Sequence, residues 1–336
     1  MKKLKIGFTY DAKSNYKLKS GDLPDKYAEF DTDETISEIE TALKSSGHKI
    51  EKIGDAHSLL KKIVQDKKWD LVFNIAEGLN SRNREAQVPT ILELFGIPYS
   101  GSDALTMALA LDKPLAKIIV SYYGVLTPKF LEIENIAQLN KKKFSLQYPV
   151  IVKLTQEGTS KGLSDDSVCR DFNQLVRKIQ SLIEKYNQPV LIEEFVAGSE
   201  FTVAVIENTP PVALPPVQTI INGRTFLGND FYTYNRVANN EIEYICPCKI
   251  STKLCQKLKT VALTACKALK VKDLGRVDIR VDEKDTVYFL ECNPLPNLGC
   301  IDIFPLVAKA IGITYNEIIC RILTAALKRN ELCLKN

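Results

Sequence analysis

The sequence predicts an α/β protein that begins with a doubly wound parallel sheet and becomes richer in strands toward its C-terminus. In roughly the first hundred residues, short apolar runs alternate with stretches of helical spacing. This is the pattern of parallel strands joined by crossover helices. After residue 197, β-branched and aromatic residues become frequent, which favours further strands. No window approaches about 18 apolar residues, so no segment is predicted to span a bilayer.

The elements of the first part follow from apolar spacing and stop signals. We expect strands over 4–9, 49–53 and 70–75 and helices over 36–43 and 87–95. Gly47 and Gly96 follow the apolar residues of the two helices, and glycine is the usual residue just beyond a helix. The polar segment 11–30 is long for a connection, so we expect it to be either mobile or functional.

The second part opens with two helical stretches that are broken at 112–114. The strands predicted after them are 148–153, 189–195, 200–206, 277–281 and 287–292, and the helices are 171–186, 254–269 and 315–327. The apolar periodicity and the β-branched content of each run decide between the two types. We find no internal repeat and no low-complexity segment.

Composition excludes several classes of protein. Of the 336 residues, 45% are apolar and 26% charged, as is usual in soluble globular proteins and not in disordered, collagen-like or membrane proteins. Lys and Arg number 45 and Asp and Glu 41, which leaves a charge of +4 and argues against nucleic-acid binding. The nine cysteines form no Cys-x-x-Cys pair, so we expect reduced thiols and a cytoplasmic location.

One candidate site follows the strand that ends at Lys153. The residues Glu-Gly-Thr-Ser-Lys-Gly occupy 157–162, and a loop with two glycines and two hydroxyl residues can bring backbone N–H groups close to a phosphate. The Walker pattern is absent. Standing alone, the motif would be read as a surface hairpin tip with a lysine at a strand end.

Oxygen-bearing side chains on two later strands form a second candidate. Alternation along a strand puts Arg276, Asp278 and Arg280 on one face, and Glu291 and Asn293 share a face of the next strand. Carboxylate and amide oxygens are ligands of hard cations. The alternative is a charged solvent face with Arg–Asp pairs.

Together these motifs resemble the ATP-grasp superfamily and, within it, the D-alanine–D-alanine ligases. The resemblance runs from about residue 70 to residue 327, with the motifs in order. It is carried by Asp112-Lys113, Pro149–Lys153, 157–162, Glu193-Glu194-Phe195, Gly198–Val203, Gly275–Asp278 and Glu291-Cys292-Asn293-Pro294, with Ile97–Ser102 closing the first part.

The resemblance implies an ATP-grasp architecture, in which two α+β subdomains grip ATP. Its sections would be a Rossmann-like domain over 1–100, a central subdomain with the phosphate loop over 101–192, and a C-terminal subdomain with the metal site over 193–336. The implied ATP-binding residues are Lys113, Lys153, Gly158, Thr159, Ser160 and Gly162 for the phosphates, Glu193, Glu194, Val196 and Glu200 for adenine and ribose, and Ile151 and Leu290 on the two faces of the base.

The implied activity is the ATP-dependent joining of two amino acids through an acyl phosphate. Asp278, Glu291 and Asn293 would bind Mg²⁺, with two ions per site and Mn²⁺ as a possible substitute. Arg276 would face the developing oxyanion, and Lys153 would act on the transferred phosphate.

The amino-acid half departs from the family pattern. Glu77 stands where the family has a histidine, and Glu29 is the nearest equivalent of the glutamate that receives the donor amine. Arg236 lies one position from Val237-Ala238, where the family has a Lys-Tyr pair, and would supply the positive charge.

Three further residues complete the implied substrate set. Thr159 lies in the phosphate loop, while Asn297 replaces a glycine and Asp302 a substrate-binding serine. The identity and chirality of the substrates therefore stay open. So does a second possibility, a nucleotide-binding regulatory homologue without ligase activity. We expect small amino-acid substrates and a homodimer, although the sequence does not fix the oligomeric state.

Overall fold

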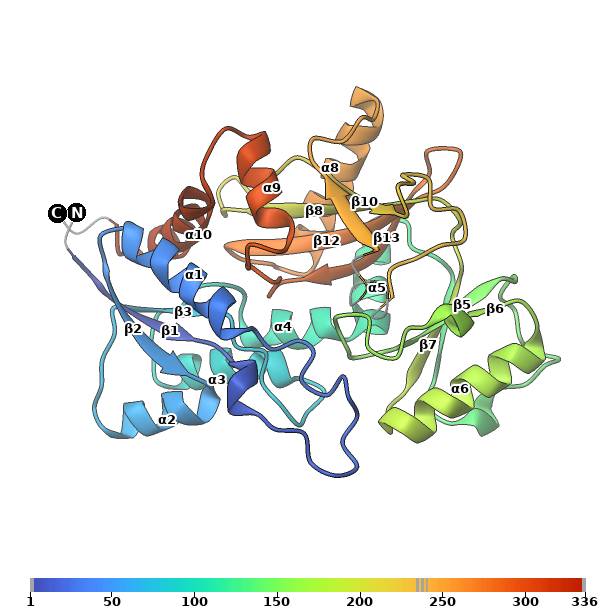
Figure 1. Ribbon diagram of the computed structural model, residues 1–336, viewed down its shortest axis with the longest axis horizontal. Helices are drawn as coiled ribbons and strands as arrows, with labels where there is room; N and C mark the ends of the chain where they lie inside the picture. Colours follow the sequence, from blue (N-terminus) through green and yellow to red (C-terminus); the bar gives the residue numbers. More distant parts are fainter. Residues whose placement is uncertain (1–2, 234–235, 237–238, 240, 334–336) are drawn as a thin grey trace.

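Three sheets and the helices that cover them make up the fold (Figure 1). The computed structural model describes residues 3–233, 236, 239 and 241–333. The strands are β1 (Lys5–Thr9), β2 (Lys49–Gly54), β3 (Leu71–Asn74), β4 (Phe130–Ile133), β5 (Val150–Leu154), β6 (Val168–Cys169), β7 (Val190–Glu194), β8 (Ser199–Ile206), β9 (Val212–Ala213), β10 (Val217–Ile221), β11 (Ile242–Ile245), β12 (Leu274–Val281) and β13 (Val287–Asn293). The helices are α1 (Asp33–Ser45), α2 (Ala56–Val64), α3 (Gln87–Leu94), α4 (Ala104–Leu111), α5 (Lys113–Tyr122), α6 (Phe172–Tyr186), α8 (Thr252–Ala268), α9 (Ile303–Ala310) and α10 (Tyr315–Arg329).

The N-terminal sheet is parallel, as predicted, with the strand order β2-β1-β3. Its first crossover helix, α1, begins three residues earlier than the apolar spacing indicates, because Thr32 caps it. The Thr32 hydroxyl accepts a hydrogen bond from the Thr35 N–H at 3.2 Å, which satisfies one of the free donors at the helix start.

The central sheet is antiparallel, with the order β4-β7-β5-β6. The apolar face of α6 covers it, and Leu175, Ile179 and Leu182 pack with the strands in one core cluster. In Figure 1 this sheet and α6 lie apart from the N-terminal sheet, and α4 and α5 lie between them.

The C-terminal sheet has the order β11-β10-β8-β12-β13, with β9 beside β8. The helix α8 packs on one face through Leu254, Leu258 and Ala262. The opposite face joins a core that also contains residues of α1, α9 and α10. The fold is thus a mixed α/β architecture with one parallel sheet and two antiparallel ones, which is the predicted class.

One apolar core joins the two ends of the chain. It runs from Leu4 and Ile6 of the first strand region to Leu323 and Leu327 of α10. Helices α1 and α10 lie side by side, and the Cys320 thiol donates to the Ala42 carbonyl at 3.4 Å across 278 residues of sequence.

Several elements of the fold differ from those predicted. Helix α2 has one buried residue, Leu59, so its apolar spacing is weak, and its start depends on Asp55, whose carboxylate accepts from the Ser58 N–H at 2.8 Å. The strands β4, β6, β9, β10 and β11 were also not predicted. All are short or have weak alternation.

The long segment after β1 is held by an aromatic cluster. Tyr16 lies 5.3 Å from Tyr27 and 4.7 Å from Phe30, measured between ring centroids. The Tyr186 hydroxyl of α6 donates to Asp25 at 2.6 Å. The segment is therefore tied to α6 by a hydrogen bond, and its functional role stays a prediction. The division at 100 and 192 stays a prediction.

Within the described residues, no single helix has the length and apolar composition to cross a membrane. The pair α9 and α10 meets that test together, although the two helices meet at 97°.

Candidate active site

The predicted nucleotide residues lie on strands of the central and C-terminal sheets, on α5, and in the loops that follow β5 and β7. Helix α5 contacts both sheets. In the central sheet, β5 and β7 are neighbours and Ile151 pairs with Glu193. The Lys153 ammonium lies 2.8 Å from Glu193 Oε2, and the Lys117 ammonium lies 2.5 Å from Oε1. Burial alone would raise the pKa of Glu193, but the two lysines lower it to about 2. The carboxylate is therefore an ion, and its role toward adenine or ribose stays a prediction.

A β-bulge shapes the facing strand. Asp278 pairs with Glu291 and Ile279 with Phe289, so Leu290 is an extra residue. Such a bulge lets two consecutive side chains leave the usual alternation. Leu290 and Glu291 are both half-buried, whereas Phe289 and Cys292 are buried. This local geometry is what would allow one strand to offer both a base contact and a metal ligand.

Arg276 and Asp278 form an ion pair, which was the alternative to a metal site left open by the sequence. Arg276 donates to both carboxylate oxygens of Asp278, at 3.2 and 3.1 Å. Thr202 donates to Asp278 at 2.5 Å and Asn293 at 3.0 Å. The side chains of Arg276 and Asp278 are 22% and 18% exposed, so the group is a partly buried network and not an open solvent face.

The residues predicted to bind metal fit a hard cation by their chemistry. Asp278 and Glu291 are cross-strand neighbours, and Asn293 adds an amide. Among the described residues, no group of three His, Cys, Asp or Glu side chains is arranged to hold a metal. The predicted set, however, has two carboxylates and an amide. The Glu291 carboxylate lies 3.3 Å from the Lys113 ammonium. Burial alone would raise the pKa of Glu291, but Lys113 and Lys153 lower it below its ordinary value.

The loop at 157–162 lies against α5 and the N-terminal segment. The Lys113 ammonium donates to the Glu157 carbonyl at 2.5 Å, so the lysine contacts both the loop and Glu291. Thr159 and Ser160 have φ values of 48° and 53°. Non-glycine residues in the left-handed region are costly and cluster at ligand-binding loops.

Glu29 is the centre of a buried ion network that closes on this loop. Its Oε1 accepts from the Gly158 N–H and from Arg84, each at 2.7 Å, and its Oε2 from Lys161 at 2.7 Å. Arg84 also donates to the Gln156 carbonyl at 2.7 Å. Burial opposes ionisation, but Arg84 and Lys161 lower the pKa of Glu29 to about 2. Arg84 was not predicted, since its sequence signal is no more than its place beside the predicted helix at 87–95.

Carboxylates of the N-terminal domain lie near this network. Glu77 is half-buried, and burial together with Glu85 and Glu29 raises its pKa well above the ordinary value. Glu85, which was not predicted, is 8% exposed, and burial raises its pKa to about 7. Burial and Asp11 raise the pKa of Asp31 to about 7 as well.

The predicted acceptor residues lie on the segment between β13 and α9. Asp302 is the N-cap of α9, where its carboxylate accepts from the Ile303 N–H at 2.5 Å. It also lies 3.4 Å from Arg276. Its carboxylate is therefore held between Arg276 and the start of α9. Asn297 is exposed and donates to Asp31 at 3.5 Å.

Arg236 is held by carboxylates and not directed at the strands with the predicted metal ligands. It lies 3.2 Å from Asp165, 3.5 Å from Asp230 and 3.7 Å from Glu241. Its predicted catalytic role stays a prediction. Val237-Ala238, aligned with the family's Lys-Tyr pair, lies outside the described residues.

Arg280 orders the predicted ribose end of the site. It is 3% exposed, pairs with Glu200 at 2.7 Å and donates to the Val196 carbonyl at 3.0 Å. Glu194 accepts from the Gln147 N–H at 3.0 Å. These contacts fix the turn between β7 and β8.

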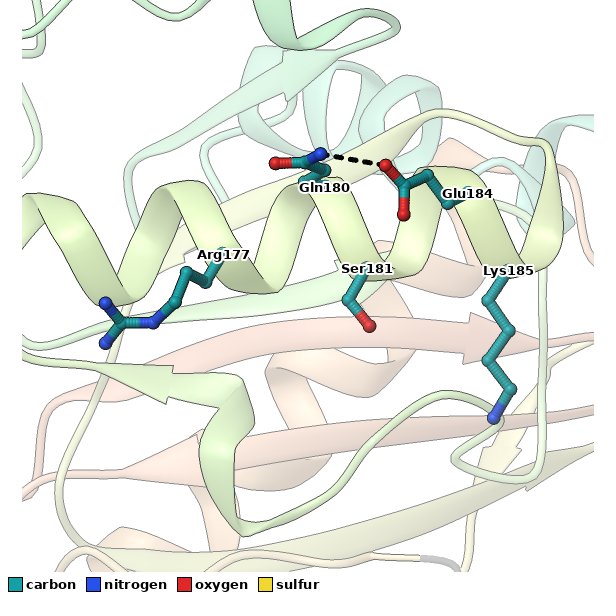
Figure 2. A pocket seen from close by; sticks show the side chains of 5 residues that line it. All are labelled: Arg177, Gln180, Ser181, Glu184 and Lys185. Carbon is teal, nitrogen blue, oxygen red and sulfur yellow. Dashed lines mark hydrogen bonds between the residues drawn. The ribbon is translucent and has the colours of Figure 1, made fainter.

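A surface hollow elsewhere is not a candidate for the same chemistry. It lies on the outer face of α6 and is lined by that helix alone (Figure 2). Its side chains are Arg177, Gln180, Ser181, Glu184 and Lys185, and Gln180 donates to Glu184 at 2.8 Å.

Comparisons with known proteins agree on one family. A family model described as D-ala D-ala ligase C-terminus matches residues 116–324. A D-alanine–D-alanine ligase of Carboxydothermus hydrogenoformans is 30% identical over 301 residues, with 83% of this chain and 93% of the relative covered. One from Hydrogenovibrio crunogenus is 28% identical over 293 residues, which covers 87% of this chain and 88% of the relative.

Solved structures are similar over nearly the whole chain. The D-alanine–D-alanine ligase of Bacillus anthracis complexed with ATP gives a TM-score of 0.77 at 23% identity, covering 98% of this chain and 99% of that one. The VanG D-Ala:D-Ser ligase of Enterococcus faecalis gives 0.75 at 20% identity, covering 97% and 100%. These two likenesses support the fold.

Proposed function

The chain belongs to the D-alanine–D-alanine ligase family, and from this premise we propose that it is an ATP-dependent ligase that joins the carboxylate of one amino acid to the amine of another. The observation that carries the proposal is the convergence of Lys113, Lys153, Arg276, Asp278 and Glu291 from α5 and two sheets, held by the ion pairs described above.

The nucleotide would lie between the central and C-terminal sheets. Ile151 and Leu290 would contact the two faces of the base, and the region around Glu193, Glu194, Val196 and Glu200 would hold adenine and ribose. Lys113, Lys153 and the loop residues Gly158, Thr159, Ser160 and Gly162 would hold the phosphates. The positive φ values of the loop support this role, because they turn successive N–H groups toward a common point.

Asp278, Glu291 and Asn293 would hold Mg²⁺, or Mn²⁺ in its place, and two ions are expected. The ions would neutralise phosphate charge and act as Lewis acids. Lys113 and Lys153 would also neutralise phosphate charge, because their salt bridges to Glu291 and Glu193 hold them at the proposed nucleotide site.

The proposed reaction has two steps. The donor carboxylate attacks the γ-phosphate of ATP to form an acyl phosphate and release ADP. The acceptor amine then attacks the acyl carbon, a proton leaves the nitrogen, and inorganic phosphate departs as the peptide bond forms. Arg276 would stabilise the oxyanion of the second step, a contribution of about 3–4 kcal/mol for comparable donors.

The expected ligand of the donor amine, Glu29, is already engaged by other residues. Glu29 would orient the donor amine only in part, since its oxygens already accept from Arg84, Lys161 and Gly158. Glu77 is a second candidate for that amine, and Thr159 would be a further substrate contact.

At the acceptor end, Asp302 and Asn297 would meet the second substrate. An ionised carboxylate cannot donate to the acceptor's carboxylate, and Arg276 offsets its charge at 3.4 Å. We infer that the acceptor differs from D-alanine, or carries an amine or hydroxyl at this point. The proposal also includes a homodimer and a cytoplasmic location, and light scattering after size-exclusion chromatography tests the first.

Measurement of ADP and phosphate release over a panel of amino-acid pairs tests the proposed function. The panel should contain both enantiomers of alanine, D-serine, because the structurally similar VanG is named a D-Ala:D-Ser ligase, and amino acids with basic side chains. The proposal expects release that requires Mg²⁺ and an amino-acid pair, with a dipeptide found by mass spectrometry. Tight ATP binding without release from any pair would instead support a nucleotide-binding homologue without ligase activity.

A further inference from the structure

Helix α5 carries two lysines one turn apart, and the nucleotide site as predicted uses only the first. Lys113 contacts Glu291 and the Glu157 carbonyl. Lys117, on the same helix face because helical neighbours recur every three to four residues, is 0% exposed. A fully buried lysine is rare unless it is paired, so we expect Lys117 to have charged or polar partners.

The Lys117 ammonium faces oxygen atoms from two sheets. It lies 2.5 Å from Glu193 Oε1 of β7, 2.9 Å from the Thr127 hydroxyl and 3.4 Å from the Phe289 carbonyl of β13. Thr127 itself donates to the Phe289 carbonyl at 2.9 Å. Phe289 directly precedes Leu290 and Glu291, so Lys117 is joined to both walls of the proposed nucleotide site.

Glu193 is shared between two lysines, and this sharing decides how much charge Lys153 can offer. The side chains of Glu193 and Lys117 are each 1% exposed, whereas that of Lys153 is 17% exposed. If Glu193 had Lys153 as its only partner, the pair would be neutral and the lysine would be held by the carboxylate. With Lys117 present as an ammonium, the three groups together carry a net charge of +1, and Lys153 is the more exposed of the two lysines.

We propose that Lys117 is a positioning residue for nucleotide phosphate binding: it neutralises Glu193 from behind, so that Lys153 can turn its charge to the phosphates. The inference rests on the proposed function, since it assumes that Lys153 meets a nucleotide. Lys117 itself is enclosed by protein and would not touch the nucleotide.

The test compares the binding of ADP and adenosine by calorimetry in the purified full-length protein. Lys117→Met should weaken ADP binding by about tenfold or more, because a charge contact near 4 Å at protein dielectric is worth at least that factor. Adenosine, which has no phosphate, should change by less than about threefold. In the double variant Lys117→Met/Glu193→Gln the carboxylate no longer competes for Lys153. The ratio of ADP affinity to adenosine affinity, which cancels any loss of base or ribose contact at Glu193, should therefore return to within about threefold of the wild-type ratio.

Arg329→Met is the matched control. It also removes a cation from a fully buried carboxylate, since Arg329 lies 2.8 Å from Asp273, which is 0% exposed on its side chain. This variant should lose stability and keep the ADP affinity of the wild type. A Lys117 variant that weakens ADP and adenosine equally would show a purely structural role and overturn the inference.

Other outcomes separate the two levels of the proposal. Wild-type protein that binds neither ADP nor ATP would overturn the proposed function itself. Wild-type binding with an unchanged Lys117→Met variant would overturn only the inference. If Lys117→Met does not fold, the double variant decides, because it removes both buried charges. A double variant whose ratio of ADP affinity to adenosine affinity lies well below that of wild type would contradict the charge argument.

Discussion

Replacement of Glu29 by glutamine should destabilise the protein by about 3 kcal/mol at neutral pH. Glutamine keeps the shape of the side chain but removes the charge that pairs with Arg84 and Lys161. The side chains of all three residues are 7% exposed, so water cannot replace the lost partner. The variant would leave two buried cations that share a salt bridge to Glu157.

The magnitude follows from the pKa of Glu29, which is lowered from 4.5 to about 2. Burial opposes this shift, and Arg84 and Lys161 outweigh it. A difference of about 2.5 units, at about 1.4 kcal/mol each, gives about 3 kcal/mol. Since the folded pKa lies below the unfolded one, this stabilisation is complete above about pH 4.5 and is lost as the pH falls toward 2.

Urea unfolding of wild type and Glu29→Gln at pH 7 and pH 3 measures both the size and the sign. The difference in the free energy of unfolding between the two proteins should be roughly halved at pH 3 relative to pH 7. Glu283→Gln, in an exposed turn, is the control and should change stability by less than about 0.5 kcal/mol. A Glu29 variant as stable as wild type at pH 7, or equally impaired at both pH values, would refute the ion-network argument.

Three further variants test the site. Glu291→Gln should lower turnover by at least about tenfold at saturating Mg²⁺ while unfolding stays cooperative, and an unchanged rate would contradict the metal assignment. Lys153→Ala should raise KM for ATP and lower kcat, whereas Lys142→Ala, an exposed loop variant, should leave both within about twofold. Asp31→Asn should flatten the pH dependence of stability: burial raises the folded pKa of Asp31 from 3.8 to about 7, so wild-type stability should fall as the pH rises through that window. Asp66→Asn, at an exposed position, should leave the slope as it is, and an equal slope in the Asp31 variant would contradict the assignment.

The parts of the fold that sequence predicts well are those where local pattern and tertiary burial agree. Strand β3 is buried at every position and was predicted from its apolar run. Helix α6 ends at the predicted residue and begins one residue later than predicted. Strands β10 and β11 were not predicted, because neither shows alternation: four of the five residues of β10 are buried, whereas β11, at the edge of the sheet, is half-buried or exposed throughout. Local alternation is weak where a strand is only partly covered.

The residues of the candidate site also divide into those that the sequence predicts and those that it does not. Asp278 and Glu291 could be predicted to be neighbours from strand alternation, and they pair across β12 and β13. The bulge at Leu290 could not, since it depends on how two strands register. Arg84 and Lys117 were missed because their partners, Glu29 and Glu193, are distant in sequence, and a single sequence does not report such pairs.

The packing of α1 against α10 has a consequence for the order in which the chain is made. Ribosomal synthesis proceeds from the N-terminus, and domains generally fold as they emerge. The apolar face of α1, with Ile36, Ile39 and Leu43, is covered in part by α10. The hydrogen bond between the two helices joins residues 278 positions apart in the sequence. A nascent chain that stops short of α10 would therefore expose that face and be a natural client for a chaperone. Release of the chain from the chaperone should coincide with emergence of α10, not with completion of the first sheet.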